Sequence, residues 1–274
     1  MRFAVSRDME SFGEPQVFST PQKFEDSLET LSKYCEQIGI KGQVGKSMGG
    51  LPGPLSMGKD SLLNAPNLGG WIGKPIKSKL EELLGAPVFL ENDAALAGLG
   101  EALFGGGKGY KIVAYLTIST GIGGARIVEE KIDVSYSGFE PGHQIIDADG
   151  TICAYCKKKV NGKTIPGDLE DHISGAGLKK RFLKEASEID SQEVWEKVAE
   201  LLAYGLNNTI VHWSPEVVIL GGPLILEDKI SIEKTKETLK DVLGIYPALP
   251  EIKKAQLGDK AGLFGSLAYL KHLQ

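Results

Sequence analysis

Three apolar segments of the sequence end abruptly in polar residues or glycines, and no other feature limits the fold as strongly. The segments are PVFLEND, KIVAYLTIST and PEVVILGG, and each has the length and apolar character of a buried strand. Helical patterns lie between them. One covers about residues 75–84, and a long one, with Asp190 and Glu193 as a capping box, reaches about Trp213. Strands that alternate with helices predict an α/β fold.

The other patterns extend this alternation along the chain. Thr20 and Pro21 have the chemistry of a helix cap and first turn, and apolar residues then recur at helical spacing from Phe24 to Ile38. KIVAYLTIST and ARIVEEKIDV, joined by residues 121–124, indicate an antiparallel hairpin. Two later helical patterns cover about residues 231–243 and 261–273.

Composition excludes several classes of partner. Lys and Arg total 31 against 36 Asp and Glu, and the net charge of −5 leaves no broad basic surface for nucleic acid or anionic lipid. No apolar run approaches the roughly 20 residues of a membrane span, and the sequence begins without an apolar stretch of the signal-peptide type. We therefore expect a cytoplasmic protein, not bound to membranes, that binds small molecules.

Glycine is unusually frequent, at 35 of 274 residues and without any repeat. The average share is roughly 7%, about half of this. Because glycine lets backbone N–H groups approach a ligand closely, glycines clustered at strand ends favour phosphate or sugar sites.

The segment FLENDAALAG places Glu91, Asn92 and Asp93 at the end of a strand and just before a helix of small residues. Ligands of open α/β sheets gather at such carboxyl ends. Asp93 could accept a proton from a hydroxyl nucleophile there, or it could simply be the N-cap of the helix.

Two strand ends that contain glycine can likewise be interpreted either as ligand sites or as simple turns. TISTGIGGA offers the hydroxyls of Ser119 and Thr120 and a run of backbone donors suited to phosphate oxygens, or it is a plain hairpin turn. VVILGG could flank a nucleotide or only turn the chain.

The segment FEPGHQIIDADGTICAYC is the densest in chemically active side chains. Its Pro-Gly pair fixes a turn that leaves Glu140 and His143 free to converge on one point. Cys153 and Cys156 have a spacing that zinc can use, although such a pair can equally be a redox pair or a surface accident. His143 could be a third ligand.

A fourth zinc ligand is not obvious from the spacing. Asp168 and His172 are both chemically suitable for that position. Zinc therefore stays one alternative among several for this part of the chain.

In this order, FLENDAALAG, TISTGIGGARI, FEPGHQIID, GDLEDHISG, VVILGG and LGDKAGLFGSLAYL together resemble the ROK family of sugar kinases and sugar-responsive repressors. The resemblance runs through nearly the whole chain and implies the two-lobed actin-like ATPase fold, which is ribonuclease H-like. It implies a small N-terminal lobe over residues 1–106, joined by the C-terminal helix 262–274, and a larger lobe over residues 107–261.

The resemblance also assigns roles. Asp93 resembles the catalytic base that takes the proton of the sugar hydroxyl, commonly the 6-OH, and Asn92 resembles a ligand of a neighbouring hydroxyl. The other implied sugar ligands are Glu140, His143 and Glu170, with Gly53 and Asn67 in the sugar-side loops GLPGPL and APNLGGW. The implied nucleotide-binding residues are Thr120, Gly121 and Gly123 in the second phosphate loop, and Gly221 and Gly222 on the adenosine side.

The start of the chain departs from the family pattern. MRFAVSRD resembles the family's second strand, so the first strand and its D-x-G-G-T phosphate loop, whose Asp helps place Mg²⁺, are missing. Omitting a first strand leaves the edge of its neighbours exposed. We therefore expect a truncated or misplaced start rather than a kinase that has lost efficient phosphoryl transfer.

The zinc box departs as well. The family pattern C-x-C-G-x-x-G-C-x-E supplies three thiolates, whereas this chain has Cys153 and Cys156, then a lysine-rich insertion, and Asp168 at the position of the third cysteine. A shell of these three residues and His143 could hold Zn²⁺, with weaker thiolate donation. Without zinc, packing alone would hold the loop that carries His143.

The resemblance implies an ATP-dependent hexose kinase that uses Mg²⁺, with glucose favoured over N-acetylmannosamine, N-acetylglucosamine and fructose, and a homo-oligomer, a dimer or tetramer. The alternative is a catalytically impaired sugar-binding protein of the same fold. A DNA-binding repressor is disfavoured because no helix-turn-helix precedes the kinase-like body and the net charge is acidic. A thiol–disulfide enzyme lacks the strand-then-helix context around its cysteines.

Overall fold

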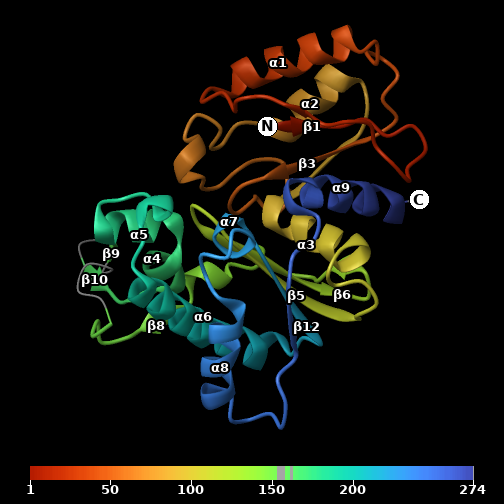
Figure 1. The fold of residues 1–274 in the computed structure, drawn as a ribbon. Helices are drawn as coiled ribbons and strands as arrows, with labels where there is room; N and C mark the ends of the chain where they lie inside the picture. Colours follow the sequence, from red (N-terminus) through yellow and green to blue (C-terminus); the bar gives the residue numbers. More distant parts are fainter. Residues whose placement is uncertain (153–157, 161–162, 274) are drawn as a thin grey trace. The chain divides into compact units, whose positions relative to one another are not determined.

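The computed structural model describes residues 1–152, 158–160 and 163–273, and it divides the chain into two compact units (Figure 1). Unit 1 comprises Met1–Gly100, Val134–Gly138 and Lys260–Gln274. Unit 2 comprises Glu101–Asp133 and Phe139–Asp259. Each unit is therefore assembled from segments that are far apart in the sequence.

Unit 1 contains two separate pairs of strands. The antiparallel pair is β1 (Arg2–Phe3) with β2 (Gln16–Val17), and the parallel pair is β3 (Ser47–Leu51) with β4 (Val88–Asn92). Its helical elements are α1 (Phe24–Gln37), η1 (Pro66–Leu68), α2 (Ile76–Leu84), α9 (Ala261–His272) and most of α3 (Asp93–Phe104). The register of β3 on β4 ends with Leu51 opposite Asn92, so the carboxyl ends of both strands meet beside the start of α3.

The helices of unit 1 follow the sequence pattern with one correction. The helix expected to start at Thr20 and Pro21 begins at Phe24, with Lys23 as its N-cap residue. Phe24 is the first apolar residue of the periodic pattern, and it is buried against Trp71 at a ring-centroid distance of 5.3 Å. Packing rather than capping chemistry therefore sets where this helix begins.

Glycines bring α3 and α9 into close backbone contact. A Cβ atom on Gly100 would overlap the carbonyl oxygen of Ala261, and one on Gly265 would overlap the carbonyl oxygen of Leu96. No larger side chain fits at this crossing. The contact attaches the C-terminal helix of the chain to the helix that begins with Asp93.

Unit 2 is built on a five-stranded sheet with the order β13-β12-β5-β6-β7. Its strands are β5 (Ile112–Ile118), β6 (Ile122–Val128), β7 (Lys131–Ile132), β12 (Val217–Gly221) and β13 (Glu251–Lys254). The antiparallel pairing of β5 with β6 confirms the predicted hairpin, and β12 lies parallel to β5. Residues 122–133 form two strands because the chain turns at Glu129 and Glu130, both of which have positive φ.

Helices cover one face of this sheet (Figure 1). Ala114, Leu116 and Ile118 of β5 pack against apolar side chains of these helices in one large core. The remaining elements of unit 2 are η2 (Pro141–His143), β8 (Ile145–Asp147), β9 (Lys158–Val160), β10 (Lys163–Ile165), β11 (Gly167–Asp168), α4 (Leu169–Ile173), α5 (Gly175–Phe182), η3 (Ala186–Glu188), α6 (Gln192–Trp213), α7 (Pro223–Leu226) and α8 (Ile232–Val242).

The long helix α6 starts differently from the prediction. Ser191 is its N-cap, and the Ser191 hydroxyl accepts the N–H of Val194 at 3.4 Å. The predicted capping box of Asp190 and Glu193 is therefore wrong by one residue. Both residues have the right chemistry, but Ser191 has it as well, and its hydroxyl makes the capping hydrogen bond.

Within the described ranges, none of the helices combines the length and the apolar character that crossing a membrane requires.

Candidate functional site

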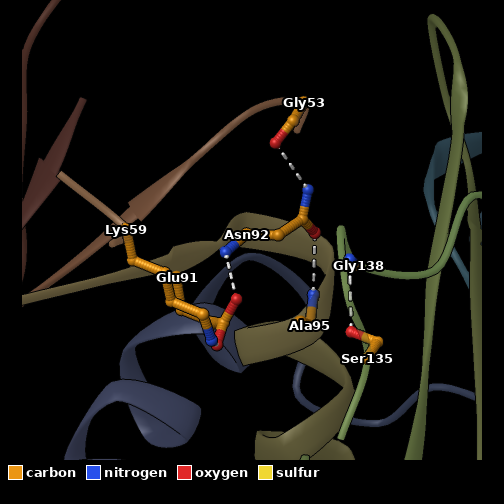
Figure 2. Close-up of polar contacts among 7 residues, drawn as sticks. All are labelled: Gly53, Lys59, Glu91, Asn92, Ala95, Ser135 and Gly138. Atoms are coloured by element: carbon orange, nitrogen blue, oxygen red, sulfur yellow. Dashed lines mark hydrogen bonds and ion pairs between the residues drawn. The ribbon is translucent and has the colours of Figure 1, made fainter. Parts of the chain in front are cut away.

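The end of β4 and the start of α3 place Glu91, Asn92 and Asp93 in succession, and Figure 2 shows the first two. Asn92 Oδ1 accepts the N–H of Ala95 at 3.1 Å, which is the hydrogen bond of an N-cap residue. The alternative that Asp93 caps the helix is therefore wrong, because Asn92 does so. The carboxyl of Asp93 is left available for other chemistry.

The Asp93 side chain is exposed, and its Oδ1 accepts the N–H of Ala94 at 2.8 Å. Oδ2 accepts no hydrogen bond from the part of the chain that the structure describes. Desolvation by the surrounding protein raises the pKa of the Asp93 carboxyl above its ordinary value of 3.8, and backbone N–H groups offset part of this effect. A carboxylate with a raised pKa and an open oxygen is suited to accept a proton.

The loop that follows β3 is tied to the same strand end at two points (Figure 2). Asn92 Nδ2 donates to the carbonyl oxygen of Gly53 at 3.3 Å. Lys59 Nζ forms an ion pair with Glu91 Oε2, and Glu91 Oε1 accepts the N–H of Asn92 at 2.9 Å. Two successive residues of β4 therefore hold the two ends of the loop from residue 53 to residue 59.

Gly53 and Lys59 of this loop both have positive φ angles. Gly53 has φ +85°, and a Cβ atom there would overlap the carbonyl oxygen of Asn64, so only glycine fits. Lys59 has φ 48° without being glycine, and its side chain is 47% exposed, whereas that of Glu91 is 8% exposed. The ion pair therefore neutralises a buried carboxylate with a cation at the surface.

The remaining predicted residue of unit 1 is Asn67, which is exposed on η1. Unit 1 also includes the turn from Val134 to Gly138, in which Gly138 N–H donates to Ser135 Oγ at 3.1 Å (Figure 2).

In unit 2 the hairpin turn between β5 and β6 lies against Glu170. Glu170 Oε2 accepts the N–H of Ile122 at 2.7 Å, and a Cβ atom on Gly121 would lie 2.7 Å from the same oxygen. Thr120 is exposed, and its carbonyl oxygen accepts the N–H of Ala176 at 3.0 Å. The structure thus brings Thr120 and Gly121 of the predicted phosphate loop next to Glu170 of the predicted sugar site.

The glycines at the end of β12 adjoin this turn. Gly222 has φ +85°, and a Cβ atom there would overlap the carbonyl oxygen of Ile118, two residues before Thr120. Gly221 is buried as the last residue of β12. Gly123 lies within β6 and pairs with Thr117, so it is a strand residue rather than part of the turn.

Glu140, His143 and Asp168 form the other part of the unit 2 site. Glu140 is exposed at the start of η2, and its carbonyl oxygen accepts the N–H of His143 at 3.1 Å. His143 Nδ1 lies 2.9 Å from Asp168 Oδ2. The His143 side chain is 51% exposed and that of Asp168 is 10% exposed, so a buried carboxylate holds one ring nitrogen of a half-exposed imidazole.

The predicted zinc site finds no support. Cys153 and Cys156 lie outside the described residues, and among the described residues no group of three His, Cys, Asp or Glu side chains could hold a metal ion. His143 and Asp168, which were predicted as ligands, instead form a polar pair.

Sequence reasoning missed two contacts of this site. It named Glu91 without a role and did not identify Lys59, although a lysine in a loop of Gly and Pro residues is a reasonable partner for a buried carboxylate. It treated Asp168 only as a metal ligand. Both contacts join residues more than 20 positions apart, 32 for Lys59 with Glu91 and 25 for His143 with Asp168.

Known proteins are similar to this chain over almost its full length. A profile of the ROK family matches residues 2–272. The glucokinase of Streptomyces coelicolor is 28% identical over 282 residues, an alignment that covers 90% of this chain and 86% of that protein. The N-acetyl-D-glucosamine kinase of Vibrio cholerae is 29% identical over 286 residues, which cover 96% of this chain and 93% of that protein.

Among solved structures, the ROK hexokinase from Thermus thermophilus superposes with a TM-score of 0.78 and 30% identity, covering 97% of this chain and 93% of that one. This similarity confirms the predicted α/β class and the actin-like ATPase fold.

Proposed function

Because the chain belongs to the ROK family, we propose that it is an ATP-dependent kinase that phosphorylates the 6-hydroxyl of a hexose, with glucose as the favoured sugar. The observation that carries this proposal is the state of Asp93. Asp93 is an exposed residue whose carboxyl has a pKa raised by desolvation and whose Oδ2 accepts no hydrogen bond from the described residues, while Asn92 performs the capping role.

Asp93 would act as the general base. Phosphoryl transfer asks little covalent chemistry of a protein, so positioning and charge neutralisation carry the rate. The base needs only to lie about 2.6 to 3.2 Å from the attacking hydroxyl and to accept its proton as the bond to phosphorus forms. The hydrogen bond that Ala94 N–H donates to Asp93 Oδ1 restrains the carboxylate and leaves Oδ2 for the sugar.

The other proposed sugar ligands are Asn92, Gly53, Asn67, Glu140, His143 and Glu170. The Asn92 amide already contacts Gly53 and Ala95, so it would act mainly by holding the loop in place. Glu170 would present Oε1 to the sugar, because Oε2 accepts the N–H of Ile122.

The proposed nucleotide side comprises Thr120, Gly121, Gly123, Gly221 and Gly222. The hydroxyl of Thr120 is the exposed donor of the turn, and Gly222 allows β12 to approach the end of β5. Mg²⁺ bound with ATP would neutralise charge on the transferred group, and Mg²⁺ commonly takes only one or two protein carboxylates beside substrate phosphates.

A coupled assay of ADP release tests the proposal. The protein is incubated with ATP, Mg²⁺ and one sugar at a time from glucose, N-acetylglucosamine, N-acetylmannosamine and fructose. Turnover with at least one of them is the expected result. Sugar binding by calorimetry without turnover would instead identify the catalytically impaired sugar-binding protein, and neither binding nor turnover would refute both.

The preference for glucose is supported by the segment SGFEPGHQIID and by glucokinases among the similar proteins. The use of ATP and a free sugar implies a cytoplasmic location. The proposed homo-oligomer, a dimer or a tetramer, is tested by light scattering on the purified protein.

A further inference from the structure

We propose that Asp168 is a positioning residue, which orients the His143 ring through a direct hydrogen bond rather than through a metal ion shared by the two side chains. Its consequence for sugar binding rests on the proposed function, whereas the hydrogen bond itself does not.

The distance between the two side chains carries the inference. His143 Nδ1 and Asp168 Oδ2 are 2.9 Å apart, the usual length of an N–H···O hydrogen bond. A tetrahedral zinc ion with ligands at roughly 2.0–2.2 Å would hold the two atoms about 3.4 Å apart. The geometry therefore fits a shared proton better than a shared metal ion.

The second oxygen of Asp168 fixes the direction of the carboxylate. Oδ1 accepts the N–H of Asp171 at 2.8 Å, and Asp168 is thereby the N-cap of α4. Because α4 holds one oxygen in this direction, the other oxygen is turned toward His143. Asp168 is buried, so the position is also protected from competing water.

The backbone holds His143 and Asp168 in register with each other. Asp168 of β11 pairs with Ile145 of β8, and Leu169 N–H donates to the carbonyl oxygen of Gln144 at 2.9 Å. On the other side, a Cβ atom on Gly142 would overlap the carbonyl oxygen of Ile122, so η2 is packed closely on β6. Both partners therefore sit on restrained backbone.

The pairing decides which ring nitrogen faces a ligand. An ionised carboxylate only accepts hydrogen bonds, so the neutral imidazole carries its proton on Nδ1 and has an acceptor at Nε2. The His143 side chain is 51% exposed, and Nε2 is the ring nitrogen that does not contact Asp168, so we assign it as the acceptor for a hydroxyl donor. Such a ring selects ligands that donate a hydroxyl proton, which is the chemistry of a sugar.

Two substitutions of Asp168 remove or reverse its hydrogen bond with His143 while they keep its N-cap of α4. Asp168→Ser keeps a good N-cap but has no second group for His143. Asp168→Asn also keeps the cap through its carbonyl oxygen and turns its NH₂ group toward Nδ1, which must then accept. Asp149→Asn changes an exposed carboxyl of the same region that accepts hydrogen bonds from Thr151, and is the matched control.

The first measurement is the histidine tautomer by nitrogen NMR on the free protein at about pH 8, where an unperturbed imidazole is neutral. We expect His143 to carry its proton on Nδ1 in the wild type and in Asp149→Asn, and on Nε2 in Asp168→Asn. In Asp168→Ser the preference for Nδ1 should be lost. A wild-type His143 protonated on Nε2 would overturn the proposal.

The second measurement uses metal analysis and kinetics. Treatment of the wild type with a chelator, followed by removal of the chelator and assay with Mg²⁺ restored, should leave both the tautomer signal and the KM for the sugar unchanged. Asp168→Ser should raise that KM about tenfold with kcat nearly constant, the size typical of losing an orienting partner. One zinc ion per chain whose removal alters the His143 signal would refute the direct bond. If no sugar is phosphorylated, the proposed function fails, and the tautomer still decides the role of Asp168.

Discussion

The end of β4 in unit 1 and the region from Glu140 to Glu170 in unit 2 hold their carboxylates in different ways. In unit 1 the buried Glu91 is neutralised by a lysine from a loop, and the pair holds that loop in place. In unit 2 Asp168 and Glu170 are held by N–H donors of the backbone and by an imidazole. The first arrangement depends on an ion pair and the second on directed hydrogen bonds.

The two units also differ in how closely their helices pack. In unit 1 Gly265 of α9 lies against the backbone of Leu96, whereas in unit 2 Gly205 of α6 lies against the side chain of Leu169. Backbone cannot move aside without disturbing hydrogen bonds, but the end of a leucine side chain can rotate. Unit 1 should therefore tolerate changes at its helix crossing less well than unit 2.

The largest expected effect separates the base of unit 1 from the sugar ligands of unit 2. Asp93→Asn should lower kcat about 10²- to 10⁴-fold with little change in the KM for the sugar, because the amide cannot accept the hydroxyl proton. Glu170→Gln should mainly raise KM. Steady-state kinetics measure both, and an Asp93→Asn enzyme with kcat within tenfold of the wild type would remove Asp93 from the proposed role.

The contrast in helix packing predicts the next effect. Gly265→Ala should destabilise the protein by about 3 kcal/mol, because a methyl group there meets the carbonyl oxygen of Leu96, while Gly205→Ala should cost about 1 kcal/mol. Urea unfolding gives both free energies. Equal costs for the two substitutions would contradict the distinction between backbone and side-chain neighbours.

A smaller effect is expected from the loop of unit 1. Lys59→Met should raise the KM for the sugar about threefold and lower the free energy of unfolding by about 1 kcal/mol, because it leaves the buried Glu91 without its cation. The effect is small because Lys59 is half exposed and the ion pair is partly screened by solvent. Lys59→Arg should return the KM most of the way to the wild-type value.

The control for this loop is Lys41→Met. It breaks the ion pair of Lys41 with Glu36, in which both side chains are more than half exposed, and it should change neither quantity measurably. A loss of sugar affinity in Lys41→Met equal to that in Lys59→Met would show that lysine removal acts through overall charge.

The last expected effect is a difference in the pH response of the two units. Burial lowers the pKa of His172 below its ordinary value of 6.5, an effect that Arg181 reinforces and that Asp147, Asp171 and Asp168 oppose. The unfolded chain therefore binds a proton before the folded chain does. Stability contributed by His172 is present above pH 6.5 and is lost as the pH falls toward the lowered pKa.

Unfolding followed from about pH 7.5 to pH 5.5 tests this sign. The free energy of unfolding of the wild type should fall by at most about 1.4 kcal/mol per pH unit from this group, and the decline should be shallower in His172→Asn. Parallel curves would contradict it. Asp93 in unit 1 has the opposite sign, since its raised pKa makes proton uptake favour the folded state.

Much of the site was predictable where local chemistry decides it. The strand end before Asp93 and the hairpin at Thr120 follow from apolar runs that stop at polar residues or glycine, and the turn at Glu140 follows from its Pro-Gly pair. The cap of α3 was not predictable, because Asn92 and Asp93 are both good N-caps and only the backbone conformation selects Asn92.

The order of apolar, polar and glycine residues along the chain was enough to establish the α/β class, the ends of the strands and the place of Asp93 directly after one of them. This is because secondary structure depends mainly on neighbours in sequence. Tertiary structure alone decided that Lys59 reaches Glu91, that Asp168 meets His143 and that Gly222 lies on Ile118. Such contacts depend on how strands and helices pack, and the free energy that selects them comes from the whole fold rather than from either partner.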